Sequence, residues 1–357
     1  MKKTRLILVG GFLGAGKTTL LLQAAKYLTG QGLRVGLVTN DQGQNLVDTA
    51  LVHQHEYPVQ EVAGGCFCCN FPDLLEAVRR LQAEVQPDVI LAEPVGSCTD
   101  LRATVVLPIQ RFHADEYEVA PLTIMLDPLR DLGHFPSTVA YLYRQQLSEA
   151  EIIALNKADQ LDEAAVREKT TVLENVYHEA RVMSLSARTA AGVVGWIEQV
   201  MTATSRIERV LDIDYETYAE AEASLGWLNT SIELTSESSL SPDAWVTQTL
   251  EALHAAFAER EMTVAHLKLH LSAAAVPFKA SITQMGEPLT WDARGENAIT
   301  DRARALLNAR VNTTPDKLRT TVEQVVGDVC VRLQTRFEYV HFECFSPLPP
   351  QPTFRLS

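Results

Sequence analysis

A glycine-rich segment near the start of the sequence has the spacing of a phosphate-binding loop. Gly11-Phe12-Leu13-Gly14-Ala15-Gly16-Lys17-Thr18 fits G-x-x-x-x-G-K-[ST] and lies between an apolar run and Leu20-Leu21-Leu22. Glycines let successive backbone N–H groups face phosphates, and the start of a following helix adds its positive end. Lys17 would reach the β- and γ-phosphates, and the Thr18 hydroxyl would ligate Mg²⁺. A glycine-rich turn without a ligand is the alternative. The nucleotide contacts predicted here are Gly11, Gly14, Ala15, Gly16, Lys17, Thr18 and Thr19.

Two polar segments further along the chain concern the base of the nucleotide. Asn156-Lys157-Ala158-Asp159 follows the apolar run Ile152–Leu155, and Ser186-Ala187-Arg188 follows the next such run. Guanine presents two adjacent donors that one carboxylate can accept, whereas adenine presents a donor beside an acceptor. The pattern therefore favours GTP over ATP, with Asp159 on the base edge, Lys157 over the base and Asn156 tying the loop. Ser186 and Ala187 complete the predicted contacts.

Three cysteines stand together in Cys66-Phe67-Cys68-Cys69, after Gly64-Gly65 and before a helix predicted to begin near Pro72. In an extended backbone Cys66 and Cys68 point to the same side, and a turn at the helix entry would bring Cys69 to them. Three thiolates hold Zn²⁺ or Co²⁺ and leave one tetrahedral position vacant, which suits an ion that must leave. Buried inert cysteines and a redox thiol are the alternatives. Cys98, Cys330 and Cys344 are interpreted as packing residues.

Apolar runs and amphipathic stretches alternate through the first half of the chain. The helical stretches include one in which Leu74, Val78 and Leu81 share a face. Strands that alternate with helices indicate βαβ units, so residues 1–205 are predicted to form an α/β P-loop NTPase domain with a mostly parallel sheet. The predicted strands are Leu6–Val9, Arg34–Thr39, Val89–Ala92, Leu122–Leu126, Ile152–Leu155 and Arg181–Ser184.

The second half has a different pattern. Residues 206–225 are acidic and weakly periodic and are predicted to be a connector. Residues 226–335 are predicted to form a smaller α+β C-terminal domain with an antiparallel sheet. Its predicted strands are Ser231–Leu234, Val264–Leu271, Phe278–Thr283 and Ala303–Val311, and its helices are Pro242–Arg260 after Ser241 and Pro315–Leu333 after Thr314, each of these two residues as N-cap. Residues 336–357 are predicted to be a proline-rich tail because Pro347, Pro349, Pro350 and Pro352 disfavour regular structure.

The composition limits the partners and the compartment. The 357 residues carry 31 Lys and Arg against 45 Asp and Glu, a formal net charge of −14, which argues against nucleic-acid binding. No apolar stretch approaches the ~18 residues of a membrane helix, so no membrane partner is expected. Met1-Lys2-Lys3 imitates the start of a secretory signal, but cleavage would remove the phosphate loop. Six cysteines without a disulfide-like spacing favour a reducing compartment, so a cytoplasmic location is expected.

The order of these motifs resembles that of a known group. Gly11–Thr18, then Gly-Cys-x-Cys-Cys, then Glu93-Pro94-Val95-Gly96 after a strand, then Asn156–Asp159 resembles the CobW-type metallochaperone GTPases, whose relatives include the HypB and UreG nickel-insertion GTPases. The likeness covers residues 1 to about 205. It implies hydrolysis of GTP to GDP and phosphate, coupled to delivery of a transition metal, usually zinc or cobalt, to a metal-requiring client protein.

The resemblance also assigns residues to roles. It places Asn40 to Asp48 in the first switch segment, where Asp48 would sense Mg²⁺ and the γ-phosphate. It also implies that Glu93 orients the attacking water or Mg²⁺. The expected catalytic residues are thus Lys17, Asp48 and Glu93. The chain departs from the family in having Asp41-Gln42 where Glu-Phe is common. It also lacks the histidine-rich stretch of many members. Of its histidines, only His53 and His55 lie near the switch, and they are the only ones considered candidate metal ligands; an ordered switch could supply a fourth ligand such as Asp41, His53 or water.

Two functions of different classes remain open from the sequence. The leading hypothesis is a GTPase that binds a transition metal at Cys66, Cys68 and Cys69 and whose GTP cycle gates metal transfer. The alternative is a GTP-regulated interaction module for a cofactor-dependent enzyme, in which the thiols hold a structural metal. Exchange of metal with nucleotide state distinguishes them. A P-loop kinase is disfavoured by Asn156–Asp159, and a homodimer is left open.

Overall fold

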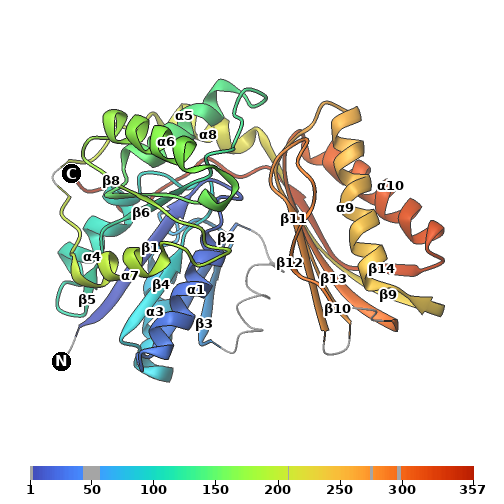
Figure 1. The fold of residues 1–357 in the computed structure, drawn as a ribbon, viewed down its shortest axis with the longest axis horizontal. Helices are drawn as coiled ribbons and strands as arrows, with labels where there is room; N and C mark the ends of the chain where they lie inside the picture. Colours follow the sequence, from blue (N-terminus) through green and yellow to red (C-terminus); the bar gives the residue numbers. More distant parts are fainter. Residues whose placement is uncertain (1–2, 43–56, 208, 274–275, 296–298) are drawn as a thin grey trace.

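Two β-sheets, each with its own helices, form the two parts of the molecule (Figure 1). The computed structural model describes residues 3–42, 57–207, 209–273, 276–295 and 299–357. Asp48, His53 and His55, which the sequence analysis singled out, lie outside these described residues. The α/β fold class with a second, antiparallel part is confirmed, as the pairing of the strands shows.

The strands of the first sheet run parallel in the order β3-β2-β4-β1-β6-β7-β8, and β5 also pairs with β1. Side chains alternate along β1 (Thr4–Gly11): Leu6 and Leu8 belong to one core cluster, and Ile7 and Val9 belong to another. The other strands are β2 (Val35–Asp41), β3 (Val59–Ala63), β4 (Val89–Glu93), β5 (Tyr117–Val119), β6 (Thr123–Leu126), β7 (Ile152–Leu155) and β8 (Arg181–Ser184).

Helices cover both faces of this sheet. Leu21 of α1 (Lys17–Gly30) and Trp196 of α7 (Val193–Thr202) pack with Ile7 on one face. Leu74 of α3 (Phe71–Val85) and Leu142 of α5 (Ser137–Ser148) pack with the opposite face. The remaining helices of this part are a π-helical turn at Arg102–Val106, α4 (Leu107–Phe112), a 3₁₀ turn at Ala158–Gln160 and α6 (Glu163–Val176). Such double coverage explains why the strands are continuous apolar runs.

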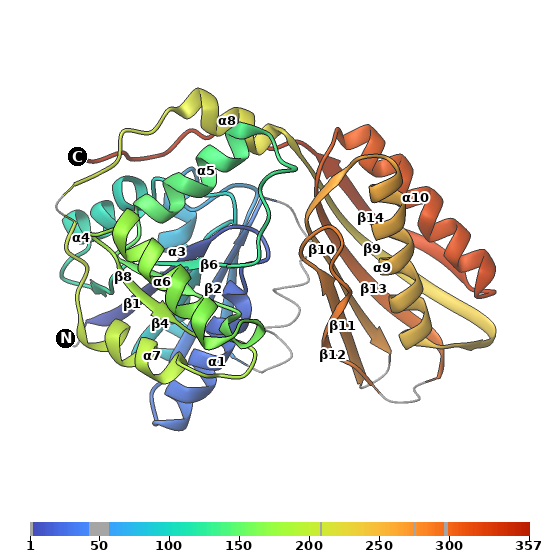
Figure 2. The same ribbon diagram turned by 45° about the horizontal axis from the view of Figure 1, so that its top comes forward.

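The second sheet is antiparallel, in the order β12-β11-β10-β13-β9-β14, and both its long helices lie on one face (Figures 1 and 2). Leu267, Leu269 and Leu271 pack under these helices, whereas Lys268, on the other face, lines a pocket with residues of the first part. The elements are β9 (Leu225–Leu240), α9 (Pro242–Glu259), β10 (Thr263–Ala273), β11 (Val276–Ile282), β12 (Thr290–Ala293), β13 (Thr300–Asn312), α10 (Pro315–Arg332) and β14 (Arg336–Phe345).

Two predicted segments differ in the structure. The expected connector contains a helix, α8 (Tyr215–Ala223), which contacts α5 and buries Tyr218 in the core of the first part. The expected tail begins later than residue 336, because Arg336–Phe345 form β14 beside β9. Ser241 caps α9 as predicted through Ala244 N–H, but Thr314 occupies the cap position of α10 without a side-chain hydrogen bond.

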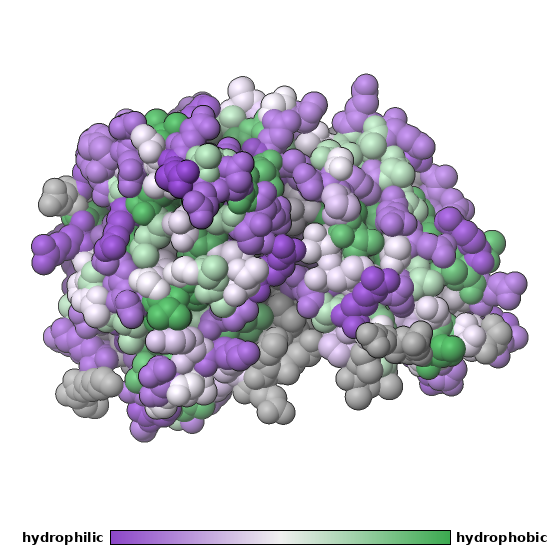
Figure 3. Space-filling model, in the orientation of Figure 1, coloured by the Kyte–Doolittle hydropathy of each residue, from purple (hydrophilic) through white to green (hydrophobic). Residues whose placement is uncertain are grey.

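The surface is mainly polar. Figure 3 shows hydrophilic side chains across one face of both parts, with smaller hydrophobic patches scattered among them. In the part of the chain that the structure describes, every helix is too short or too polar to cross a bilayer.

Candidate nucleotide and thiol sites

The loop between β1 and α1 has the backbone that a phosphate cradle requires. Gly11, Gly14 and Gly16 have φ angles of 129°, 78° and 95°, a region that side chains with a Cβ rarely occupy. A Cβ on Gly16 would lie 2.4 Å from Asn156 Nδ2, so that position also has no room for a side chain. Lys17 and Thr18 begin α1 and are both buried at the mouth of the loop.

A carboxylate from β4 meets both of these side chains. Thr18 Oγ1 donates to Glu93 Oε2 at 2.8 Å, and Lys17 Nζ lies 3.8 Å from Glu93 Oε1. A hydroxyl beside a carboxylate at a phosphate loop is a set of hard oxygen ligands, which fits Mg²⁺. The structure therefore brings Lys17, Thr18 and Glu93 together, whereas Asp48 lies outside the described residues.

Asn156 joins the phosphate loop to the base-side loops. Its Nδ2 donates to Ala15 O at 2.7 Å, and its Oδ1 accepts from Ala187 N–H at 2.8 Å. Ala15 thus contributes a carbonyl to this contact, and Gly11 ends strand β1. One buried amide therefore fixes the distance between the phosphate end and the base end of the site.

The base-side residues are held by ion pairs. Lys157 Nζ lies 2.5 Å from Asp127 Oδ2, and Asp159 pairs with Arg188. Burial opposes ionisation of Asp159, but hydrogen bonds from Ser186 and Arg188 outweigh it, so the pKa of Asp159 lies below its usual value. Asp159 is therefore a carboxylate that accepts hydrogen bonds, which is the form that guanine needs.

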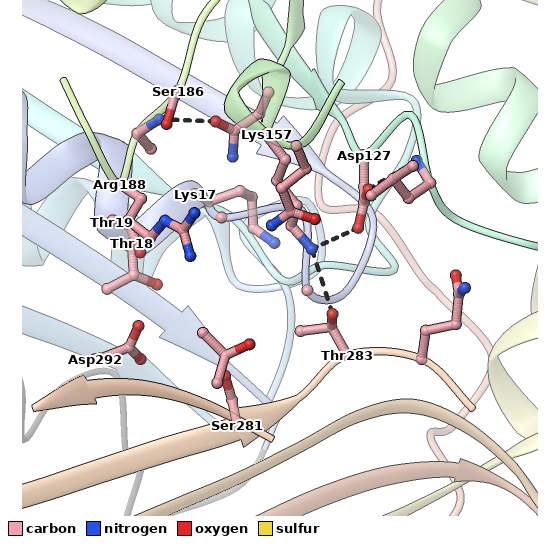
Figure 4. A pocket seen from close by; sticks show the side chains of 18 of the residues that line it. Lys17, Thr18, Thr19, Asp127, Lys157, Ser186, Arg188, Ser281, Thr283 and Asp292 are labelled. Carbon is pink, nitrogen blue, oxygen red and sulfur yellow. Dashed lines mark hydrogen bonds and ion pairs between the residues drawn. The ribbon is translucent and has the colours of Figure 1, made fainter. Parts of the chain in front are cut away.

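The second sheet forms one wall of the same pocket. The cavity has a volume of about 390 Å³ and lies between the phosphate loop and the polar face of β10, β11 and β12. Figure 4 shows Ser281 and Thr283 on the opposite side of the cavity from Lys17 and Thr18, with Thr283 joined to Lys157. The lining includes Gly14, Gly16, Lys17, Thr18, Thr19, Glu93, Asn156, Lys157, Asp159, Ser186, Ala187, Lys268 and Lys279. Sequence patterns did not predict the wall from the second sheet, because the contact joins distant segments.

The three cysteines of the motif meet as a cluster at the carboxyl end of the sheet. Cys66 Sγ lies 2.7 Å from Cys68 Sγ and 3.2 Å from Cys69 Sγ, and Cys68 and Cys69 are 3.7 Å apart. A turn closed by Cys69 N–H and Asn70 N–H on Cys66 O makes this convergence possible. A group of thiols within 4.8 Å of one another fits a soft or borderline metal ion.

A fourth thiol touches this cluster. Cys98 Sγ lies 3.7 Å from Cys68 Sγ, and its side chain is buried. The sequence interpretation of Cys98 as a packing residue agrees with its burial but did not anticipate this contact. The sequence held a signal for this contact, because Cys98 follows β4 and the cysteine motif follows β3, and the loops after parallel strands gather at one edge.

The thiols differ in acidity. Hydrogen bonds from Cys66 and Cys68 lower the pKa of Cys98 to about 6 in spite of its burial. Its hydrogen bond with Cys66 raises the pKa of Cys69 to about 11, and hydrogen bonds within the cluster together with burial also raise the pKa of Cys68. Because the pKa values of Cys68 and Cys69 are raised, the cluster becomes a set of thiolates only when a cation binds or when several protons are lost.

The segment after β14 crosses the cluster. Gln351 N–H donates to Cys69 Sγ at 3.2 Å, and Thr353 N–H donates to Cys68 O at 2.9 Å. Phe354 packs edge-on against Phe71 of α3. Residues 346–357 therefore form a cover over the thiols, which the predicted proline-rich tail did not suggest. We refer to these residues as the covering segment.

Two contacts connect the end of β2 with other parts of the chain. Gln42 Nε2 donates to Glu222 Oε1 of α8 at 3.2 Å, and Ser97 also donates to that oxygen. Asp41 accepts two hydrogen bonds, 2.9 and 3.0 Å long, from Arg310 of β13. Asp41 and Gln42 immediately precede residues 43–56, which contain most of the expected switch segment.

Comparison with known proteins decides the family. The protein-family model described as "CobW/HypB/UreG, nucleotide-binding domain" matches residues 5–184, about half of the chain. The chain belongs to the CobW/HypB/UreG family. The resemblance noted from the sequence is thereby confirmed, and the matched range contains both the phosphate loop and the cysteine motif.

Curated relatives of this CobW/HypB/UreG chain carry zinc chaperone names. A protein called zinc chaperone CobW from Sinorhizobium sp is 30% identical over 193 residues, 44% of this chain and 52% of the relative. A protein called zinc chaperone YeiR from Escherichia coli (strain K12) is 30% identical over 159 residues, 44% of this chain and 47% of the relative. The chain spans about half the length of the curated relatives it matches.

Solved structures also resemble this member of the family. HypB from Helicobacter pylori in complex with nickel is 15% identical, with a TM-score of 0.42, over 56% of this chain and 86% of that chain. Zn(II)-bound YjiA GTPase from E. coli is 14% identical, with a TM-score of 0.36, over 91% of this chain and 99% of that chain.

Proposed function

We propose that this chain is a GTP-hydrolysing metallochaperone, which binds zinc or cobalt at Cys66, Cys68 and Cys69 and delivers it to a client protein under control of the GTP cycle. Family membership supports a nucleotide-dependent metal protein in general. The zinc chaperone names of the relatives favour zinc as the metal. All six cysteines are free thiols, which is consistent with work in a reducing cytoplasm.

The nucleotide site supports GTP as the substrate. Lys17 is buried beside Glu93 at the phosphate end, where a cation can neutralise charge that develops during phosphoryl transfer. Asp159 is an ionised acceptor at the other end of a cavity of about 390 Å³, large enough for a nucleotide. Bound Mg²⁺, held by Thr18 with Glu93 close by, would supply further charge stabilisation at the phosphates.

One observation carries the link between the two sites. Asn40, at the end of β2, donates to Val62 O and Gly65 O, and its Oδ1 accepts from Phe67 N–H at 2.9 Å. The same Oδ1 also accepts from Val95 N–H at 3.4 Å, two residues after Glu93. Movement of the β2 or β4 ends on nucleotide binding therefore displaces the backbone that holds Cys66 and Cys68.

A pair of titrations tests this proposal. Metal affinity is measured by competition with a chelator at saturating Mg²⁺-GTP or Mg²⁺-GDP, and nucleotide affinity is measured with and without Zn²⁺. If one two-state element serves both sites, the two couplings must be equal, with typical values of roughly 5- to 150-fold. Lys17→Ala should bind metal without nucleotide as the parent does but should lose GTP hydrolysis, which separates the two activities.

The outcome also decides between this function and the second candidate. The second candidate is a GTP-regulated interaction module that holds a permanent, structural metal. The burial of the thiol cluster beneath the covering segment favours this candidate. Equal metal affinity in all nucleotide states would support that module and contradict the metallochaperone. A triple Cys66, Cys68 and Cys69 to serine variant should lose the coupling and keep intrinsic GTP binding.

A further inference from the structure

Three motif cysteines leave a tetrahedral metal one ligand short, so the residues around the cluster matter for its chemistry. Zn–S bonds of about 2.3 Å at tetrahedral angles place neighbouring sulfurs about 3.8 Å apart. Cys68 lies 3.7 Å from Cys69 and 3.7 Å from Cys98. Two separate chain segments thus present sulfur to Cys68 at the spacing of a metal-thiolate edge.

The position of Cys98 is fixed by its surroundings. Gln146 Nε2, from α5, donates to Gly96 O at 3.0 Å and to Cys98 O at 2.9 Å, so it holds both ends of this short turn. Cys98 N–H closes the turn on Val95 O. The Cys98 thiol contacts Cys68 Sγ and, at 3.9 Å, Thr99 O. Its direction toward the cluster is therefore set by the fold rather than by a mobile side chain.

A carboxylate is the rival for the fourth position. Glu222 of α8 lines a cavity of about 480 Å³ together with Cys66 and Cys69. Its Oε1 already accepts hydrogen bonds from Ser97 and Gln42. Zn²⁺ and Co²⁺ accept both thiolate and carboxylate, but a softer, sulfur-rich set favours the thiol that already touches Cys68.

We propose that Cys98 is the fourth ligand, and that this chain binds its metal as a tetrathiolate of Cys66, Cys68, Cys69 and Cys98. The inference rests on the proposed metal-binding function and specifies its site. The thiols release their protons to solvent as the metal–sulfur bonds form. The three motif thiols lie within 4.8 Å of one another, and Cys98 reaches them through Cys68, so binding draws the motif loop and the Cys98 turn together.

This ligand set gives the metal a direct connection to the nucleotide site. Cys98 lies five residues after Glu93, which accepts a hydrogen bond from Thr18 at the phosphate loop. A metal–sulfur bond to Cys98 therefore attaches the metal to the chain segment that begins at the nucleotide. Displacement of that segment during the GTP cycle would convert the closed four-sulfur site into an open three-sulfur site from which metal can leave.

X-ray absorption of the zinc-loaded full chain counts the ligands without any mutation. The expected result is a shell of four sulfur atoms at about 2.3 Å. Three sulfurs with one oxygen or nitrogen neighbour would overturn the assignment of Cys98 while leaving the metallochaperone intact. A chain that binds no Zn²⁺ at all would instead contradict the proposed function.

Variants loaded with Co²⁺ identify the residue. In Cys98→Ser, the sulfur-to-cobalt charge-transfer absorption should fall by about a quarter, because one of four thiolates is lost. Zn²⁺ affinity, measured by competition with a chelator, should fall by at least about tenfold. Loss of a residue that only hydrogen-bonds a metal ligand already lowers metal affinity by about that factor. Cys330→Ser, which replaces an equally buried thiol of the second part, is the matched control and should keep both values. Unchanged absorption in Cys98→Ser would overturn the assignment of Cys98, and a loss of affinity in Glu222→Gln but not in Cys98→Ser would place Glu222 at the fourth position.

Discussion

Two asparagines do much of the positioning in this molecule. Asn156 joins Ala15 to Ala187 across the nucleotide site, and Asn40 joins the cysteine loop to the chain after Glu93. Each uses both its donor and its acceptor, so neither aspartate nor leucine can replace it without leaving a buried partner unsatisfied. The backbone of both candidate sites is therefore held by side chains other than the predicted metal ligands and phosphate contacts.

Base selection is the first prediction. Asp159→Asn replaces an acceptor with an amide, which cannot accept from both guanine donors, so GTP affinity should fall by roughly 10- to 150-fold, the loss of about 1.5–3 kcal/mol for a hydrogen bond to a charged group. The amide can donate to the extra carbonyl of xanthine, so affinity for the xanthine nucleotide should rise. Competition binding measures the affinities for GTP, ATP and the xanthine nucleotide. Arg188→Ala, which removes the partner of Asp159 but not the acceptor, should retain the preference for GTP; unchanged preference in Asp159→Asn would mean that the base is recognised elsewhere.

Glu149 provides the second prediction, which concerns pH. Burial raises its pKa to about 8, the charge of Asp100 adds to the rise, and hydrogen bonds from Arg102 N–H and Thr99 and the charge of Arg102 only partly oppose it. Above the ordinary carboxyl pKa of 4.5, the folded state therefore holds a proton that the unfolded chain has lost. Stability should fall as the pH rises through this interval, by up to about 1.4 kcal/mol per unit for one such proton.

Urea unfolding of Glu149→Gln at several pH values between about 5 and 8 tests this slope. Because burial also raises the pKa of Glu222 to about 8, the variant should lose only one of the two proton contributions. Glu222→Gln is the matched comparison, and the double variant should have the flattest profile. A slope as steep as that of the parent in Glu149→Gln would show that its carboxyl is already ionised in the folded protein.

Helices and strands with a strong local sequence pattern were predictable from the sequence. Elements that depend on packing against distant parts of the chain were not. Ser241 before Pro242 predicted the start of α9, and apolar runs predicted the parallel strands. Helix α8 was missed because its acidic sequence carries little periodicity, although Tyr218 is fully buried against distant residues. Strand β14 was missed because the prolines that follow it led its residues to be assigned to the tail, although apolar and polar residues alternate along it on either side of an irregularity between Tyr339 and His341.

The same distinction applies to the site residues. The phosphate loop and the cysteine motif are short, contiguous strings, so their spacing alone specifies a local geometry. The contact between Cys98 and Cys68 depends instead on the order β3-β2-β4 in the sheet, which places two loops at one edge. Sequence spacing cannot supply such strand order when parallel strands are joined by long crossovers.

The third prediction concerns the covering segment. Phe354 anchors it between Phe71 and Phe112, and two aromatic pairs are worth about 1–2 kcal/mol. Phe354→Ala should therefore increase transient opening by about 5- to 30-fold. The measurement is the rate at which Cys69 reacts with an alkylating reagent, followed by mass spectrometry. Phe337→Ala, at a half-exposed aromatic of β14, is the control; an unaltered rate in Phe354→Ala would mean that the segment does not limit access.

The two parts of the molecule are joined through polar contacts rather than through apolar surface alone. Arg130 donates to both Leu13 O of the phosphate loop and Ala265 O of β10, and Gln284 accepts from Asp131 N–H. Arg310 is fully buried, lies over the ring of Trp227 and binds both carboxylate oxygens of Asp41. The second sheet therefore contacts the end of β2 directly, next to the expected switch segment.

The fourth prediction follows from that ion pair. Asp41→Asn leaves a buried guanidinium without its counter-charge, and breaking a buried pair costs about 3–5 kcal/mol, less here because Asp41 is partly exposed. A double-mutant cycle with Arg310→Met, read from urea unfolding, should give a coupling energy above about 1 kcal/mol. The exposed pair Arg336 and Glu237 is the control and should give a coupling of about 0–1 kcal/mol. Equal couplings for the two pairs would contradict a structural role for the buried one.

The pairing of Asp41 with Arg310 has a consequence for anyone who recombines these proteins. A graft of the second sheet from a relative with an apolar residue at the position of Arg310 would confront Asp41 with a surface that cannot bind a carboxylate, and a graft in the opposite direction would bury a cation without an anion. Hybrids should fold well when the residues at the positions of Asp41 and Arg310 are exchanged together, and poorly when only one of the two is exchanged. In this chain, the compatibility of the two parts therefore depends on two positions that lie 269 residues apart in sequence.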